Sequence, residues 1–320
     1  MGNCMRRSEK LTAEIVARDG AKVYPTVRLH GSPKSILAAY IRLALLHKAV
    51  SLDFVASEAE GTVTLQVGSE VISGSRETLL RFIDARFPGP SLSPSRREEE
   101  TTSLLASLTR LHHISLLWHV ERMLKWADDL KTRGAKRIVD PSVGTPRMEI
   151  RKFARSYSDV HEVMMEHAQM EETVLFPIFE KADRGLAKAA KEEHARDLPL
   201  MNGIKEVIKS VGVLDSGTPD YHEALYTLST RLKSLQGQCK QHFAEEEVEL
   251  LSLMEALELS KEQELSALEQ CFEVMQGTHS RLLKFLLDGL PPHEAMKYLD
   301  LISKCRDNEK MESMLQLIVK

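Results

Sequence analysis

Residues 167–172 read HAQMEE and residues 242–247 read HFAEEE, so the pattern H-x-x-x-E-E occurs twice in this chain. Both copies lie in stretches whose apolar residues recur at helical intervals, and the stretches continue alike, as ETVLFPIFE and EVELLSLME. Four residues make about one turn of an α-helix, so the histidine and the glutamate four residues later lie one above the other on the same face. The repeat predicts a helical bundle that holds metal ions in its interior.

Apolar neighbours indicate that both motifs face the core. His167 and His242 each lie in the middle of an apolar stripe. A carboxylate that is buried without a partner is costly, so an inward-facing Glu171 and Glu246 need cations or hydrogen bonds. One such pair on a helix is most often an exposed ion pair, whereas two pairs on apolar faces of alternate long helices favour a metal site. The two stripes consist of Val160, Val163, Met164, Met170, Val174 and Ile178, and of Leu232, Leu235, Cys239, Leu250 and Leu253.

Two further stretches offer histidines to the same interior. KEEHARDLPLM, residues 191–201, contains His194, and Pro199 should kink or restart that helix. LTRLHHISLLWHVERML, residues 108–124, contains three histidines. His113 shares its face with several leucines and a valine and is the predicted ligand, while His119, on another face, is the alternate.

The number of donors indicates more than one metal ion. Four imidazoles and two carboxylates exceed the tetrahedral requirement of one zinc, and carboxylates can bridge two ions. Imidazole with carboxylate suits iron or manganese. Glu172, Glu245 and Glu247 would accept hydrogen bonds from the histidines or form a solvated helix edge. The predicted ligands are His113, His167, Glu171, His194, His242 and Glu246.

Composition excludes several other classes of protein. A chain of 320 residues is long for one helical domain, which predicts two domains or one with an appendage. A net charge of -4 gives no electrostatic case for nucleic acid. The best apolar run, SILAAYIRLALL, is short and contains Arg42, which argues against a transmembrane helix. The cysteines form no disulfide-like framework, which favours a reducing, intracellular and cytoplasmic setting; they are Cys4, Cys239, Cys271 and Cys305.

The N-terminal residues leave membrane attachment open. Gly2 fits N-myristoylation and Cys4 would be a neighbouring palmitoylation site, with Arg6 and Arg7 as a small basic patch. Position 6 is arginine where the motif prefers serine or threonine. The alternatives are an anchor on the cytoplasmic face of a membrane and a disordered polar tail.

The remaining patterns divide the chain into five segments. The β-α-β-β-β-α order of the second segment includes a hairpin that turns at Gly68-Ser69. Long helices are expected at about 101–133, 148–182, 186–212 and 219–257, joined by short connections as in an antiparallel four-helix bundle. The segments are a tail (1–23), a small α/β domain (24–88), a linker (89–100), the bundle (101–257) and an appended helical cap (258–320).

The small α/β domain resembles the N-terminal, thioredoxin-like domain of glutathione transferases. The similar pieces are VRLHGSPKSILAAYIRLAL, the GSEVISGS hairpin and LLRFIDARFP. The resemblance implies a glutathione site in which Ser35 takes the place of the activating hydroxyl and Ser75 that of the glutamyl-binding serine. Gly74 replaces the expected acid and Thr64 the expected cis-proline. These departures favour a vestigial site in a module kept for packing or partner binding.

The bundle resembles the hemerythrin-like, HHE cation-binding family over about 101–257, with HAQMEETVLFP as the closest match. The resemblance implies two irons, with manganese or zinc as substitutes, held by the six predicted ligands. The fourth helix has LLSLME where LFP is usual, and position 198 is leucine where respiratory members have a second histidine. The second departure argues against reversible dioxygen carriage.

Together these patterns predict a protein of iron, oxygen or redox sensing or homeostasis. Its expected partners are metal ions, dioxygen or another small diatomic ligand, and a protein that the sequence does not identify. No catalytic residue is assigned, and an enzyme is the less favoured reading. The alternatives are a di-iron oxidase or peroxidase, a glutathione-linked transferase that uses Ser35, and a membrane-tethered adaptor whose bundle is only a scaffold.

Overall fold

The computed structural model describes residues 25–57, 62–92, 103–136, 145–182, 184–185, 187–257 and 259–319. Gly2 and Cys4 lie outside the described residues, as does most of the predicted linker, so the lipidation prediction stays a prediction.

The described part of the chain begins with the predicted small α/β unit. Its sheet has the order β2-β1-β3-β4, in which β1 runs parallel to β2 and antiparallel to β3. The hairpin between β3 and β4 turns at Gly68, whose φ of 61° is the left-handed conformation that glycine adopts without strain. The predicted order of elements is confirmed: β1 (Thr26–Gly31), α2 (Ile36–Leu46), β2 (Ser51–Ala56), β3 (Thr64–Val67), β4 (Glu70–Ser73) and α3 (Arg76–Arg86).

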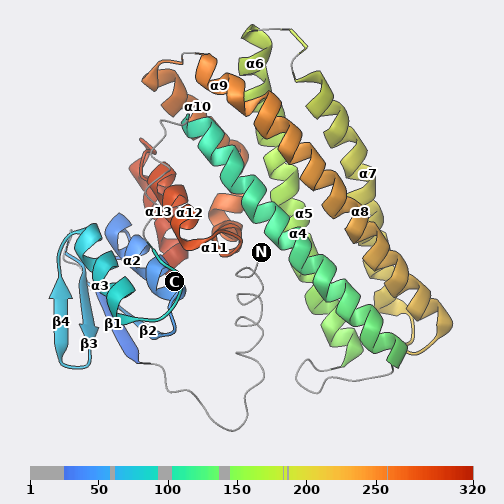
Figure 1. Ribbon diagram of the computed structural model, residues 1–320, viewed down its shortest axis with the longest axis horizontal. Coiled ribbons are helices and arrows are strands. Elements are labelled where there is room, and N and C mark those ends of the chain that lie inside the picture. Colours follow the sequence, from blue (N-terminus) through green and yellow to red (C-terminus); the bar gives the residue numbers. More distant parts are fainter. Residues whose placement is uncertain are drawn as a thin grey trace.

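Long helices form the bundle on the other side of the molecule (Figure 1). Two of them, α5 and α8, start at the dipeptide Thr-Pro. Thr145 and Thr218 each accept a hydrogen bond from the backbone three residues on, and proline at the first helical position needs no partner for its nitrogen. The elements are α4 (Leu104–Lys136), α5 (Pro146–Met170), η1 (Glu171–Leu175), α6 (Phe176–Ala182), α7 (Lys188–Val213), α8 (Pro219–Glu249) and α9 (Leu251–Ala256).

Two details of these helices differ from the prediction. The helix does not restart at Pro199, one of the two predicted outcomes, because α7 runs through this position as one helix. Pro199 and Ala195 are both exposed, so the Ala195 carbonyl that loses its helical donor faces water. The helix predicted over 148–182 is interrupted by the π turn η1, in which Phe176 donates to the carbonyl of Glu171, five residues back. Pro177, directly after it, has no N–H to continue regular α-helical bonding.

The C-terminal segment is a middle layer and not the appended cap that the sequence predicted. It lies between the α/β unit and the bundle (Figure 1), and its helix α12 contacts both α2 and α4. One continuous apolar core extends from Leu29 of the sheet through Tyr298 of this segment to Phe153 of the bundle. The segment consists of α10 (Lys261–Val274), η2 (Thr278–Leu282), α11 (Leu283–Asp288), α12 (Pro292–Ile302) and α13 (Asn308–Val319).

Candidate metal centre

Six side chains from four helices meet inside the bundle. In each H-x-x-x-E pair the helix brings the two side chains together. His167 Nε2 lies 3.3 Å from Glu171 Oε1, and His242 Nε2 lies 3.3 Å from Glu246 Oε2. His194 of α7 reaches Glu171 Oε2 at 3.4 Å, and His113 of α4 reaches Glu246 Oε2 at 3.4 Å. Donor atoms bound at about 2.1 Å to a common ion lie roughly 3.0–3.4 Å apart. The observed spacing therefore fits metal coordination.

The donors form two groups that share one residue. Glu171, His194, His242 and Glu246 offer atoms that all lie within 4.8 Å of one another, and so do His113, His167 and Glu171. Glu171 presents Oε1 toward His167 and Oε2 toward His194, which is the arrangement of a carboxylate between two ions.

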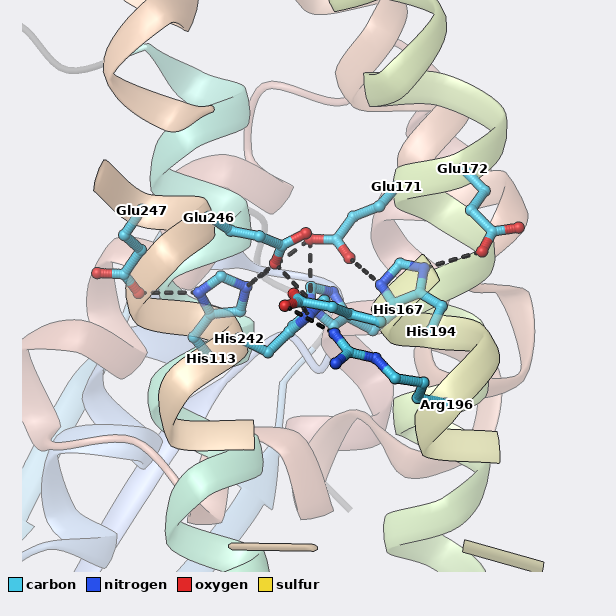
Figure 2. Close-up of polar contacts among 10 residues, drawn as sticks. His113, His167, Glu171, Glu172, His194, Arg196, His242, Glu246 and Glu247 are labelled. Atoms are coloured by element: carbon cyan, nitrogen blue, oxygen red, sulfur yellow. Dashed lines mark hydrogen bonds and ion pairs between the residues drawn. The ribbon is translucent and has the colours of Figure 1, made fainter. Parts of the chain in front are cut away.

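Outer carboxylates orient three of the four imidazoles. The Nδ1 atoms of His113 and His194 lie 2.8 Å from Glu247 and Glu172, respectively (Figure 2). The third contact joins Nδ1 of His242 to Glu193 at 2.5 Å. Such an acceptor holds the proton on Nδ1 and leaves the Nε2 lone pair directed at the centre.

Glu193 is the functional residue that sequence reasoning missed. Glu172 and Glu247 were expected either as acceptors or as a solvated edge, and the structure makes them acceptors; Glu245 instead bonds to Gln241 on the surface. The available signal for Glu193 was its position directly before His194 in KEEHARD.

Several polar atoms at the centre are buried without a hydrogen bond to any described residue. They are His113 Nε2, His167 Nδ1 and Nε2, Glu171 Oε2, and both carboxylate oxygens of Glu246. His113, Glu171 and Glu246 are at most 4 % exposed. Buried polar groups are normally paired, so donors that converge in this way fit a bound cation. The residues present therefore suit a metal.

Without a metal, protons balance the charges of this centre. Burial lowers the pKa of His113, but the carboxylates of Glu171, Glu246 and Glu247 outweigh it and raise this pKa to about 10. Glu171 and Glu172 likewise raise the pKa of His194 to about 9 against the effect of burial. Two influences act in opposite directions on Glu246. Burial raises its pKa, whereas the imidazoles of His113 and His242 lower it, and the resulting pKa is about 2.

His167 differs from the other three imidazoles. Burial and then the neighbouring imidazoles, His113 first, hold its pKa well below the usual range, so it stays neutral. A neutral imidazole is ready to bind a metal without losing a proton.

The remaining sequence candidates lie elsewhere. The alternate ligand His119 is not brought to the centre, because its Nε2 lies 2.7 Å from the carbonyl of Phe285 and its ring stacks on that phenyl group. Ser35 and Ser75 cap helices α2 and α3 by accepting the N–H groups of residues 38 and 78.

The comparison with protein families agrees with this geometry. Residues 105–254 match the model of the hemerythrin HHE cation binding domain. This segment is a hemerythrin-type domain. It runs from α4 into α9 and includes all six converging side chains. Domains of this family bind metal ions, typically iron.

The other comparisons add no relative to the hemerythrin-type domain. Neither the curated proteins nor the solved structures contain a match to the chain. The helices of the described residues include none that combines the length and the apolarity needed to cross a bilayer.

Proposed function

We propose that the hemerythrin-type domain binds two iron ions and that their occupancy serves iron, oxygen or redox sensing. The observation that carries the proposal is the convergence of six side chains from four helices, whose facing nitrogen and oxygen atoms lie 3.3–3.4 Å apart. Several of these atoms, on His113, His167, Glu171 and Glu246, are buried without a hydrogen bond to a described residue. Manganese or zinc would suit the same donors, since imidazole and carboxylate accept all three metals.

The four histidine ligands divide into two pairs, one for each ion. His113 and His167 would hold one ion and His194 and His242 the other, with Glu171 and Glu246 between them. Two imidazoles and two carboxylate oxygens leave positions open on an octahedral ion, where bound iron would supply one-electron chemistry and a place for a small ligand.

The sensing role is supported by the dependence of this core on a cation. Glu171 and Glu246 are buried inside the bundle, so the folded state needs positive charge at this point. Protonated His113 and His194 supply it in the metal-free protein, and a bound ion would replace these protons. A ligand that binds only the folded state stabilises it, and its loss destabilises the domain. The stability of the bundle would thereby depend on how much metal is available to the protein.

Metal analysis with thermal unfolding tests the proposal. We expect two ions per chain and a higher Tm with metal than without it. The double variant H167A/H242A should lose both the metal and the metal-dependent rise in Tm. H222A, on the same helix α8 as His242 but outside the centre, is the matched control. Substoichiometric metal, or the same Tm with and without it, would refute the proposal.

For the α/β unit we propose a packing role in place of a glutathione-dependent activity. Both serines of the predicted glutathione site serve as helix N-caps, a role that by itself accounts for a hydroxyl at each position. The test is retention on immobilised glutathione, which this proposal expects to be absent. Retention that S35A abolished would favour a transferase.

A further inference from the structure

A cavity of about 540 Å³ lies against the metal centre, between α5, α7 and α8. His167, His194 and His242 line it, so three of the four proposed imidazole ligands are reached from this side. His113 is not among the lining residues, and its ring stacks on Phe243 with centroids 4.1 Å apart. The cavity therefore gives access mainly to the ion that His194 and His242 would hold.

The walls of the cavity are largely apolar. Leu116, Met164, Met201 and Phe243 form its buried part. Met165 and Leu198 also line it and are 37 % and 38 % exposed, so apolar side chains continue from the interior to the surface. Large apolar side chains at the surface are common singly, but here they border an opening that leads inward.

Leu198 places an apolar side chain on this side of the centre. It lies one turn after His194 on α7, where a side chain points in the same direction as the histidine. Its isobutyl group adds to the apolar wall of the cavity and offers no atom that could bind a metal.

The size of the cavity exceeds what a diatomic ligand needs. A water-sized molecule occupies on the order of 30 Å³ in the liquid, and cavities of roughly 300–1,000 Å³ hold organic ligands. Polar residues of the lining, among them Lys191 and Asp197, lie on α7 beside the apolar wall. The cavity thus suits an organic molecule with an apolar body.

We propose that this cavity binds a small organic molecule with an apolar chain and one terminal oxygen donor, a carboxylate or a hydroperoxide, whose oxygen meets the ion held by His194 and His242. The inference rests on the proposed metal site and adds its ligand class. Oxygen is the expected donor because iron and manganese, which suit a mixed set of imidazole and carboxylate ligands, also bind carboxylate oxygen. The chain then lies along Met164 and Leu116 and leaves between Met165 and Leu198.

The test uses the full chain loaded with cobalt(II), whose visible spectrum reports on its ligands. Straight-chain carboxylates from acetate to octanoate are titrated. Each methylene group that enters an apolar site strengthens binding about fourfold. We expect the half-saturating concentration of the spectral change to fall with each added methylene until the cavity is full.

Substitution at the opening separates the cavity from non-specific binding. L198W should remove the gain with chain length, so that octanoate binds no more tightly than acetate. Cobalt content and Tm are measured for each variant to show that the metal site is intact. V213W, at a position on the same helix that is 79 % exposed, is the control and should behave as the wild type.

Each outcome decides a different point. Two bound cobalt ions with no dependence on chain length would overturn the inference and leave the metal site standing. Octanoate binding without any spectral change would also overturn it, since the oxygen would then not reach the metal. A chain that binds no cobalt would overturn both the inference and the proposed function.

Discussion

Tyr298 and Asp300 lie two residues apart on α12 and make contacts on opposite sides of it. The Tyr298 hydroxyl lies 3.0 Å from Nε2 of His112, the neighbour of the proposed ligand His113. The Asp300 carboxylate accepts hydrogen bonds from Tyr40 and Arg76 of the α/β unit. Residues two apart on a helix are rotated by about 200°, so one helix connects the metal centre with the α/β unit.

The hydrogens of the Tyr298 contact can be assigned from its partners. His279 Nδ1 lies 2.8 Å from the Met275 carbonyl and must donate to it, which leaves Nε2 of His279 as an acceptor. The Tyr298 hydroxyl, 2.8 Å from that Nε2, therefore donates to His279 and accepts from His112. All three side chains are at most 5 % exposed.

Replacing Tyr298 by phenylalanine should destabilise the chain. Y298F leaves the Nε2 atoms of His112 and His279 buried without a partner, and each such group costs about 1–3 kcal/mol. We expect a loss of roughly 2–4 kcal/mol in urea unfolding of the metal-free protein. Y226F removes a hydroxyl from a tyrosine that is 63 % exposed and should change stability little. Equal effects of the two variants would contradict the assignment.

Replacing Asp300 should loosen the α/β unit without disturbing the centre. D300N removes the charge that holds Tyr40 and Arg76 to α12. Amide hydrogen exchange should become faster in α2 and α3 and stay unchanged in the part of α5 around His167. D220N, at an exposed position near the start of α8, is the control for a lost surface charge. Exchange that rises equally in all helices would argue for global destabilisation instead.

The outer carboxylates should tune metal affinity. E193Q, E172Q and E247Q each weaken the acceptor on one imidazole and should lower metal affinity about 10- to 100-fold. E245Q alters the same acidic run but only a surface contact to Gln241, so its affinity should match the wild type. Competition with a chelator of known affinity measures the difference.

Metal binding should strengthen as pH rises. The pKa values of about 10 for His113 and about 9 for His194 lie above the unfolded value of about 6.5. Their protonation therefore stabilises the metal-free fold below about pH 6.5, and this contribution is lost as the pH rises toward 9 and 10.

A metal must displace these protons, so the rise in Tm on metal addition should grow between about pH 6 and pH 8.5. Binding should release at least two protons, one each from His113 and His194, and a further fraction from His242, whose pKa Glu246 also raises against the effect of burial. Calorimetry in buffers of different ionisation enthalpy counts them. A binding heat that does not depend on the buffer would contradict the protonated metal-free centre.

The spacing of apolar residues predicted the helices and the direction in which the ligand side chains point, because both depend on local geometry. His167 and Glu171 lie four residues apart on one apolar stripe, and the helix alone brings their atoms within 3.3 Å. His113 was chosen over His119 by the same reasoning, and the structure places only the former at the centre.

What the sequence did not predict depends on contacts between distant elements. Glu193 becomes an acceptor only because α7 packs beside α8 and brings it to His242. Tyr298 looks like an ordinary core residue of a C-terminal helix until α12 is placed against α4. Glu193 stands directly before His194, but no spacing within its segment relates it to His242, and none relates Tyr298 to His112.

The π turn at Glu171–Leu175 fits one extra residue into a single turn of helix. Every position after it is rotated by about 100° relative to an uninterrupted α-helix. Deleting one residue within 172–175 would thus restore a regular α-helix that continues into α6 without the extra rotation. The deletion would leave His167 and Glu171 where they are. Among related chains, a gap of one residue directly after the first motif, residues 167–172, would therefore mark the loss of the π turn and not the loss of a ligand.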